Sequence, residues 1–191
     1  SVSALDSVIG SGGNDAVRMM GGGTLNVDLI DTVIGGTSTT DVVHLTSTTS
    51  LSVSNVETVQ GTTDTTDAVR MLSAGTLATS AVDSVTGTSG NADILQLAGS
   101  DGGAVSVSAI ETVRGSAATD SVTLLASGGI AVSGVESVIG TSGADSLVYQ
   151  SGGTVSVSAI ETVTGTTGTG DVAAIMAAGA TTLSVSGIES V

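Results

Sequence analysis

The sequence predicts an all-β protein: a single parallel β-solenoid, of the β-helix or β-roll type, that runs continuously through residues 1–191. Three observations predict it. A short acidic motif recurs every 25–28 residues, apolar residues alternate with polar ones at period two, and Gly-containing turns separate the alternating stretches. Each repeat is expected to form one coil with three short strands, which gives about seven coils.

The composition fits a narrow core. Tyr149 is the single aromatic residue, and the chain has no Pro and no Cys. Globular cores usually rely on aromatic side chains for buried area, so this core must be filled by Val, Leu, Ile, Met and Ala. The abundant Val, Ile and Thr favour strands.

The acidic motif consists of an aliphatic residue, an acid, Ser or Thr, and Val. Its eight copies begin at Leu5, Ile30, Val56, Val82, Ile110, Val135, Ile160 and Ile188. In the first seven copies a glycine lies two residues after the Val: Gly10, Gly35, Gly61, Gly87, Gly115, Gly140 and Gly165. The aliphatic residue and the Val are three positions apart, so both cannot face inward on one straight strand. The chain is therefore expected to bend at the acid.

Two further strands complete each repeat. The first is an Asp motif, Asp-x-apolar-x-apolar, which begins five or six residues after the glycine; the second carries pairs such as Leu25/Val27 and Val105/Val107. Equivalent strands are expected to stack on one another at about 4.8 Å. That stacking would place fifteen acids in two columns: the bend acids, and Asp15, Asp41, Asp67, Asp93, Asp120, Asp145 and Asp171. One interpretation is that these carboxylates accept backbone N–H groups at turns, and the other is that they bind Ca²⁺.

Two turns resemble a known family. Residues 10–18 and 140–148 are similar to the nonapeptide G-G-x-G-x-D-x-U-x of RTX (haemolysin-type) proteins, departing from it at the second glycine. The resemblance implies a secreted bacterial protein in which stacked turns hold Ca²⁺, with Asp15 and Asp145 as the ligands in this chain. The turns that lead to Asp41, Asp67, Asp93 and Asp171 carry one extra residue, and Ala118 stands where the turn before Asp120 should have glycine. Ca²⁺ is therefore expected at a minority of turns at most, and no other cofactor.

Charge and composition argue against several functions. With a net charge of −15 and three Lys+Arg, a nucleic-acid partner and an anionic membrane surface are not expected. No apolar run approaches the ~20 residues of a membrane helix, so membrane insertion is not expected either. A flat sheet face gives His44 no pocket in which to act, so we expect no enzyme.

The residues at outward-facing strand positions predict three surface features. Stacking of equivalent strands would give a polar row that includes Ser54 and Ser80, a partly apolar stripe that includes Val42 and Ile94, and a basic column. The basic column would contain Arg18, His44 and Arg70. An exposed apolar stripe usually marks an interface.

The predicted function is structural. The chain starts and stops in the same phase of the repeat, so it is expected to be a segment of a longer array whose partner is itself, end to end and laterally. The prediction is a secreted, self-assembling protein of the extracellular space or cell surface: a filament, surface-layer or adhesin stalk segment. The alternative is a degenerate RTX-type module that folds on Ca²⁺ and assists export.

Overall fold

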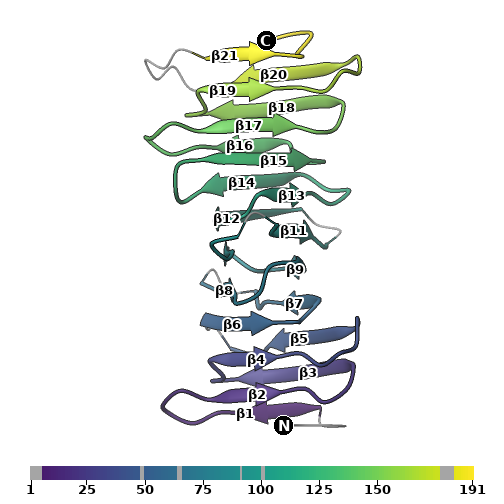
Figure 1. Cartoon of the computed structure of the whole chain (residues 1–191), viewed down its shortest axis with the longest axis vertical. Helices are drawn as coiled ribbons and strands as arrows, with labels where there is room; N and C mark the ends of the chain where they lie inside the picture. The colour runs from purple at the N-terminus through teal and green to yellow at the C-terminus, as the bar shows by residue number, and fades with distance from the viewer. Residues whose placement is uncertain (1–5, 48–49, 64–65, 91, 100–101, 177–182) are drawn as a thin grey trace.

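The computed structural model describes residues 6–47, 50–63, 66–90, 92–99, 102–176 and 183–191. Over these residues the chain is an all-β parallel solenoid without helix, as the sequence predicts. Its strands form a tall stack with the N-terminus at one end and the C-terminus at the other (Figure 1). The strands are seen broadside near both ends of the stack and nearly end-on around β9 and β11, so the stack twists strongly along its length.

The described strands form two parallel sheets. The odd sheet contains β1 (Ser7–Ile9), β3 (Gly23–Asp28), β5 (Asp41–Leu45), β7 (Thr58–Gln60), β9 (Thr76–Ser80), β11 (Ile94–Leu97), β13 (Thr112–Arg114), β15 (Gly129–Ser133), β17 (Ser146–Tyr149), β19 (Thr162–Thr164) and β21 (Ser184–Ser186). The even sheet contains β2 (Ala16–Arg18), β4 (Thr32–Ile34), β6 (Ser50–Ser54), β8 (Ala68–Met71), β10 (Ser84–Thr86), β12 (Gly103–Ser108), β14 (Asp120–Leu124), β16 (Ser137–Ile139), β18 (Gly153–Ser158) and β20 (Asp171–Ile175).

The chain passes from one sheet to the other after every strand. It returns to the same sheet about 18 residues later, as in the pairing of Leu25 with Val43 and of Leu51 with Val69. Each sequence repeat does contain three strands, as predicted, but those three strands span about one and a half turns. The predicted count of about seven coils is therefore too low, because the solenoid makes about nine turns.

This half-turn offset changes which strands are neighbours. Strands of the same kind alternate between the sheets, and in one sheet they recur only at every third position: the Asp motif forms β2, β8, β14 and β20 in the even sheet and β5, β11 and β17 in the odd sheet. The prediction that equivalent strands stack directly was wrong. The predicted polar row, apolar stripe and basic column are each divided between two faces; Arg18 and Arg70 lie on the even sheet and His44 lies on the odd sheet.

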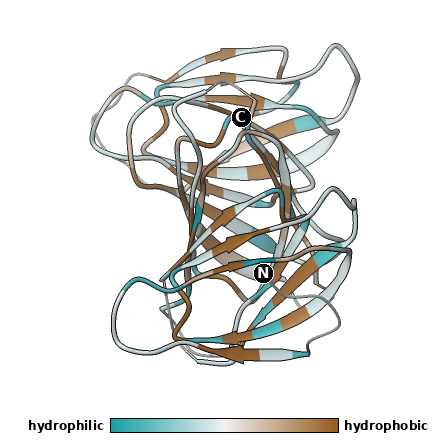
Figure 2. Cartoon of the chain, turned by 60° about the horizontal axis from the view of Figure 1, so that its bottom comes forward, coloured by the Kyte–Doolittle hydropathy of each residue, from teal (hydrophilic) through white to brown (hydrophobic). Residues whose placement is uncertain are grey.

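The core is the aliphatic layer between the sheets. Figure 2 shows hydrophobic segments that alternate with polar ones along the strands, as the period-two pattern predicts. Val113 is fully buried in β13, where it pairs with Leu95 and Val132. Buried residues run from Val17 to Ala173 in one cluster, so a single core extends through the described turns.

Candidate functional site

The carboxylate of the Asp motif closes the turn that precedes it. Oδ2 of Asp93 accepts the backbone N–H of Thr88 at 2.6 Å and the Thr88 hydroxyl at 2.7 Å. The same backbone bond is made by Asp15, Asp41, Asp67, Asp120, Asp145 and Asp171. The prediction that these acids accept backbone N–H groups at turns is confirmed.

The bend acid of the next repeat lies directly beside this turn. Its carboxylate accepts the backbone N–H of the Asp: Oε2 of Glu111 lies 2.9 Å from the nitrogen of Asp93. In return, the Glu111 N–H donates to the Asp93 carbonyl at 3.2 Å. The two predicted acid columns are therefore one series of pairs: Asp15/Asp31, Asp41/Glu57, Asp67/Asp83, Asp93/Glu111, Asp120/Glu136, Asp145/Glu161 and Asp171/Glu189.

The pairs are spread over both edges of the solenoid. Four lie where odd strands end and three lie where even strands end; the first set contains Asp15, Asp67, Asp120 and Asp171, and the second contains Asp41, Asp93 and Asp145. On either edge a pair recurs at every third strand, which is about 14 Å at the usual strand spacing. Because Coulomb repulsion falls with distance, successive pairs repel one another less than carboxylates stacked directly at about 4.8 Å would. Because each repeat spans one and a half turns, the acid pairs of successive repeats lie on opposite edges. This separation reduces the repulsion that stacking of an acidic repeat would otherwise cause.

Glycine at the start of each Asp turn is required by close packing. A Cβ on Gly35 would overlap the Asn55 carbonyl oxygen, and a Cβ on Gly61 would overlap that of Ala81. The residue that presents this carbonyl has a positive φ: Leu29, Asn55, Ala81, Ala109, Gly134, Ala159 and Gly187. The motifs in the sequence did not predict this position, although Asn55, Gly134 and Gly187 are residue types that tolerate a positive φ.

Burial separates the seven turn acids into two groups. Asp15 is partly exposed, and the other six are buried. Four buried Oδ1 atoms have no hydrogen-bond partner: those of Asp41, Asp67, Asp93 and Asp171. These are the four turns with one extra residue between glycine and Asp. By contrast, Oδ1 of Asp145 accepts the Gly128 N–H at 2.9 Å, so in this RTX-like turn both carboxylate oxygens are occupied.

No described group of three or more His, Cys, Asp or Glu side chains could hold a metal ion. A cation at Asp15 or Asp145 would therefore need hydroxyl, carbonyl or water ligands, which Ca²⁺ accepts. At Asp145 such a cation would compete with three hydrogen bonds to the carboxylate. Ca²⁺ at these two residues stays a prediction.

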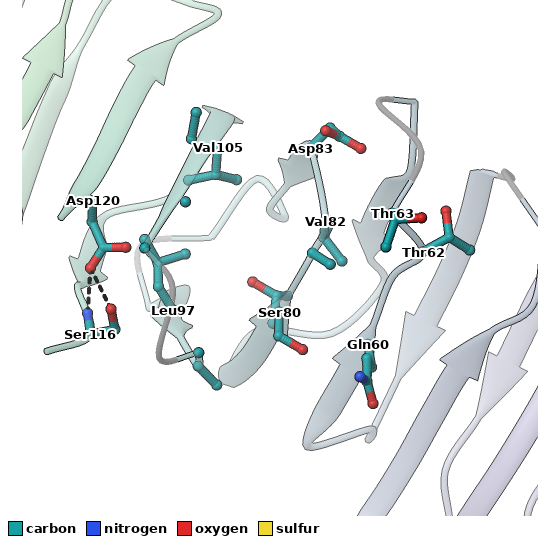
Figure 3. A pocket seen from close by; sticks show the side chains of 17 residues that line it. Gln60, Thr62, Thr63, Ser80, Val82, Asp83, Leu97, Val105, Ser116 and Asp120 are labelled. Atoms are coloured by element: carbon teal, nitrogen blue, oxygen red, sulfur yellow. Dashed lines mark hydrogen bonds between the residues drawn. The ribbon is translucent and has the colours of Figure 1, made fainter. Parts of the chain in front are cut away.

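A groove of about 650 Å³ lies beside one edge (Figure 3). It occurs where the register steps by more than the usual turn, since Val85 pairs with Val107. Leu97 and Val105 contribute its apolar wall. Asp83 and Asp120 are the titratable groups among its described lining residues, and one oxygen of each is already held by a backbone N–H. The Ser116 hydroxyl donates to Oδ2 of Asp120 at 2.9 Å, a bond of the turn that this carboxylate closes.

The fold and the paired carboxylates define a class: a two-sheet parallel β-solenoid built from an acidic repeat. Comparisons with protein-family models, curated proteins and solved structures found no match to this chain. Among the described residues, the structure contains no helix with the length and apolar character needed to span a membrane.

Proposed function

We propose that this chain is a structural, self-assembling segment of a secreted protein, used as a rod in a filament, a surface layer or an adhesin stalk. The observation that carries the proposal is the single core that extends through the described turns. A solenoid of this kind converts chain length into rod length, at about 4.8 Å for each turn. The bend acids are exposed or half-buried and place carboxylates at the surface of both edges, which favours solubility of an extended body.

End-to-end association is part of this proposal. Within the chain, β1 and β21 are the outer strands of the odd sheet, and β2 and β20 are those of the even sheet. On β20 part of the outer side is already paired, since Val172 forms a parallel bridge with Ser190. Outer strands otherwise present unpaired N–H and C=O groups on one side, which another parallel solenoid of the same twist could satisfy. Assembly without rotational closure would give an open fibre.

Imaging of the intact assembly tests the location. Antibodies raised against this chain, used as electron-dense labels on sections of the producing cells, should mark a filament, layer or stalk outside the cell. Label confined to the cell interior would contradict an extracellular structural role.

A second function is favoured by one observation. The four buried Asp oxygens without a donor leave uncompensated polar groups inside the rod, which a bound cation could satisfy. This supports the alternative of a degenerate RTX-type module that folds on Ca²⁺ during export. Here the free oxygens lie on the four turns that depart from the RTX motif.

Calcium titration separates the two functions. For a structural rod we expect a full β-sheet circular dichroism spectrum in chelator, and calorimetry with at most two Ca²⁺ sites, at Asp15 and Asp145. Asp145→Asn and Asp15→Asn should each remove one of any such sites. A cooperative transition from disorder to β-structure on addition of Ca²⁺ would instead support the export module.

A further inference from the structure

The two outer faces of the solenoid differ, although the same repeat builds both. Where the Asp motif lies on the even sheet, the residue five positions after its Asp is large, apolar and exposed: Met20, Leu72, Leu125 and Met176 are 61%, 48%, 55% and 68% exposed. The residues at the same position after the Asp on the odd strands β5, β11 and β17 are Thr46, Ala98 and Gln150. The residue type therefore follows the face, which a uniform solvent-exposed surface would not require.

The rest of the even face is small and carries no described acid. The outward residues near the starts of its strands are Ala16, Thr32, Ser50, Ala68, Ser84, Ala104, Ser121, Ser137, Thr154 and Val172. Near the strand ends, Ile34 and Ile139 add to the large apolar residues. The described outward charges are two cations, Arg18 and Arg70. The odd face also has exposed aliphatic residues, Ile9 and Val148. Most of its large outward side chains are polar or charged: Asp28, His44, Gln60, Gln96 and Arg114.

We propose that the even face is a lateral interface for a second copy of this chain, with the two rods parallel about a two-fold axis along their length. Such an axis places the strand ends of one copy against the strand starts of the other. Large residues such as Leu72 and Leu125 then pack against small ones such as Ala68 and Ser121. The contact is isologous, because one face supplies both the projecting and the receding surface.

A second copy fits this face better than an unrelated partner. The large residues recur at every third strand, about 14 Å apart at the usual spacing, and another copy has the same period and the same twist. Two equally twisted rods can wind about a common axis and remain in register, whereas a partner of another period would lose register. Ten strands at about 4.8 Å and roughly 15 Å of width give about 700 Å² per copy, close to a standard interface.

Charge favours the same arrangement. The carboxylate pairs lie on the edges and the described even-face residues are free of acids, so two copies can meet without apposed carboxylates at the centre of the contact. The edges still repel over longer distances, because each copy has a net charge of −15. Added salt should therefore strengthen the association, in contrast to an interface made of ion pairs.

Sedimentation of the full chain over a range of concentrations tests the interface, which specifies the lateral contact of the proposed structural role. We expect a dimer whose dissociation constant rises roughly a hundredfold in Leu125→Asp, because a carboxylate would be buried in the contact. The matched control is Val148→Asp, which adds the same charge at a 43% exposed aliphatic residue on the odd sheet and should leave the dimer unchanged. A monomeric wild-type chain, or equal weakening by both variants, would overturn the proposal.

A cysteine variant tests the orientation. The chain has no Cys, so Ser156→Cys, which is outward on β18 near one end of the rod, would be its single thiol. A parallel dimer should form a disulfide between two copies at this position, and Gln96→Cys on the odd sheet should not. Absence of the Ser156→Cys disulfide in a dimer would overturn the parallel arrangement. These assays use purified protein, so their failure is distinguishable from a failure of the extracellular location in cells.

Discussion

At the residue scale, the tightest constraints in this rod concern a glycine and a single apolar side chain. Gly35 lies against the backbone carbonyl of Asn55, one turn further along the solenoid. No side-chain rotation can relieve an overlap with backbone atoms, so the glycine has no substitute at this position. This accounts for the recurrence of glycine two residues after the Val of the acidic motif.

Gly35→Ala should lower the free energy of unfolding by about 3 kcal/mol, because the new methyl group would push two turns apart. Thermal melting followed by circular dichroism measures the loss. The control is Gly21→Ala, at a glycine whose added Cβ would meet nothing within 4 Å. Equal effects of the two substitutions would show that the close approach is not the cause.

Val113→Asp tests the core at mid-rod. The side chain is fully buried, so an unpaired carboxylate there should destabilise the protein by about 4 kcal/mol or more and unfold neighbouring turns. Thr112→Asp introduces the same charge at the adjacent, outward residue and should change the melting temperature little. Protection of amide hydrogens in β11, β13 and β15 would report the loss locally. A folded Val113→Asp variant with normal protection would contradict this core.

At the element scale, the repeated unit is a turn in which two backbone segments are held by two carboxylates. The Asp side chain binds the N–H that follows the glycine, and the bend acid of the next repeat binds the N–H of the Asp. The Ser or Thr hydroxyl adds a bond but is not required, because the equivalent residue in one turn is Gly36.

Truncating the Asp carboxylate should therefore lower the free energy of unfolding more than removing the Thr hydroxyl. Asp93→Ala leaves the Thr88 N–H and hydroxyl without an acceptor, and we expect a loss of about 2–3 kcal/mol. Thr88→Val removes the hydroxyl alone and should cost about 1 kcal/mol. Chemical denaturation of the two variants under identical conditions compares them. A larger effect of Thr88→Val than of Asp93→Ala would contradict the assignment of the backbone bond as the principal one.

At the scale of the whole molecule, the main feature is the ratio of one and a half turns to one repeat. It distributes the acid pairs over both edges. It also places equivalent strands of successive repeats on alternate faces, so that each face receives the Asp-motif strand of every second repeat. Large apolar residues at every second repeat can then be confined to one face. The number of repeats between two strands therefore decides whether those strands lie on the same face.

Deletions should reveal this coupling. Removal of residues 36–61, which is one repeat, moves all later strands to the opposite sheet and divides the apolar residues between the faces. Removal of residues 36–87, which is two repeats, keeps each later strand on its own sheet. Both variants should retain β-sheet circular dichroism, and only the second should retain the lateral dimer in sedimentation. Dimerisation of both would contradict the link between face and repeat.

The sequence alone determined the class of fold and the strands. Period-two alternation requires one buried face, and a recurring motif without large core residues requires stacked, thin layers. It also predicted the aliphatic core in which Val113 is buried and the bend at the acid of each motif. Of the two interpretations of turn acids such as Asp93, it included the observed one, in which they accept backbone N–H groups. These features depend on residues close together in the chain.

Only the tertiary structure decided which strands are neighbours. The period of the sequence is three strands, whereas the period of the solenoid is one strand in each of two sheets, and no local pattern reveals that difference. Because of it, Asp93 pairs with Glu111 and not with another turn acid, and Arg18 and His44 lie on opposite faces. Side-chain columns depend on how the chain closes each turn. That closure is set by the packing of two sheets across one core, which is a property of the assembled rod and not of a single repeat.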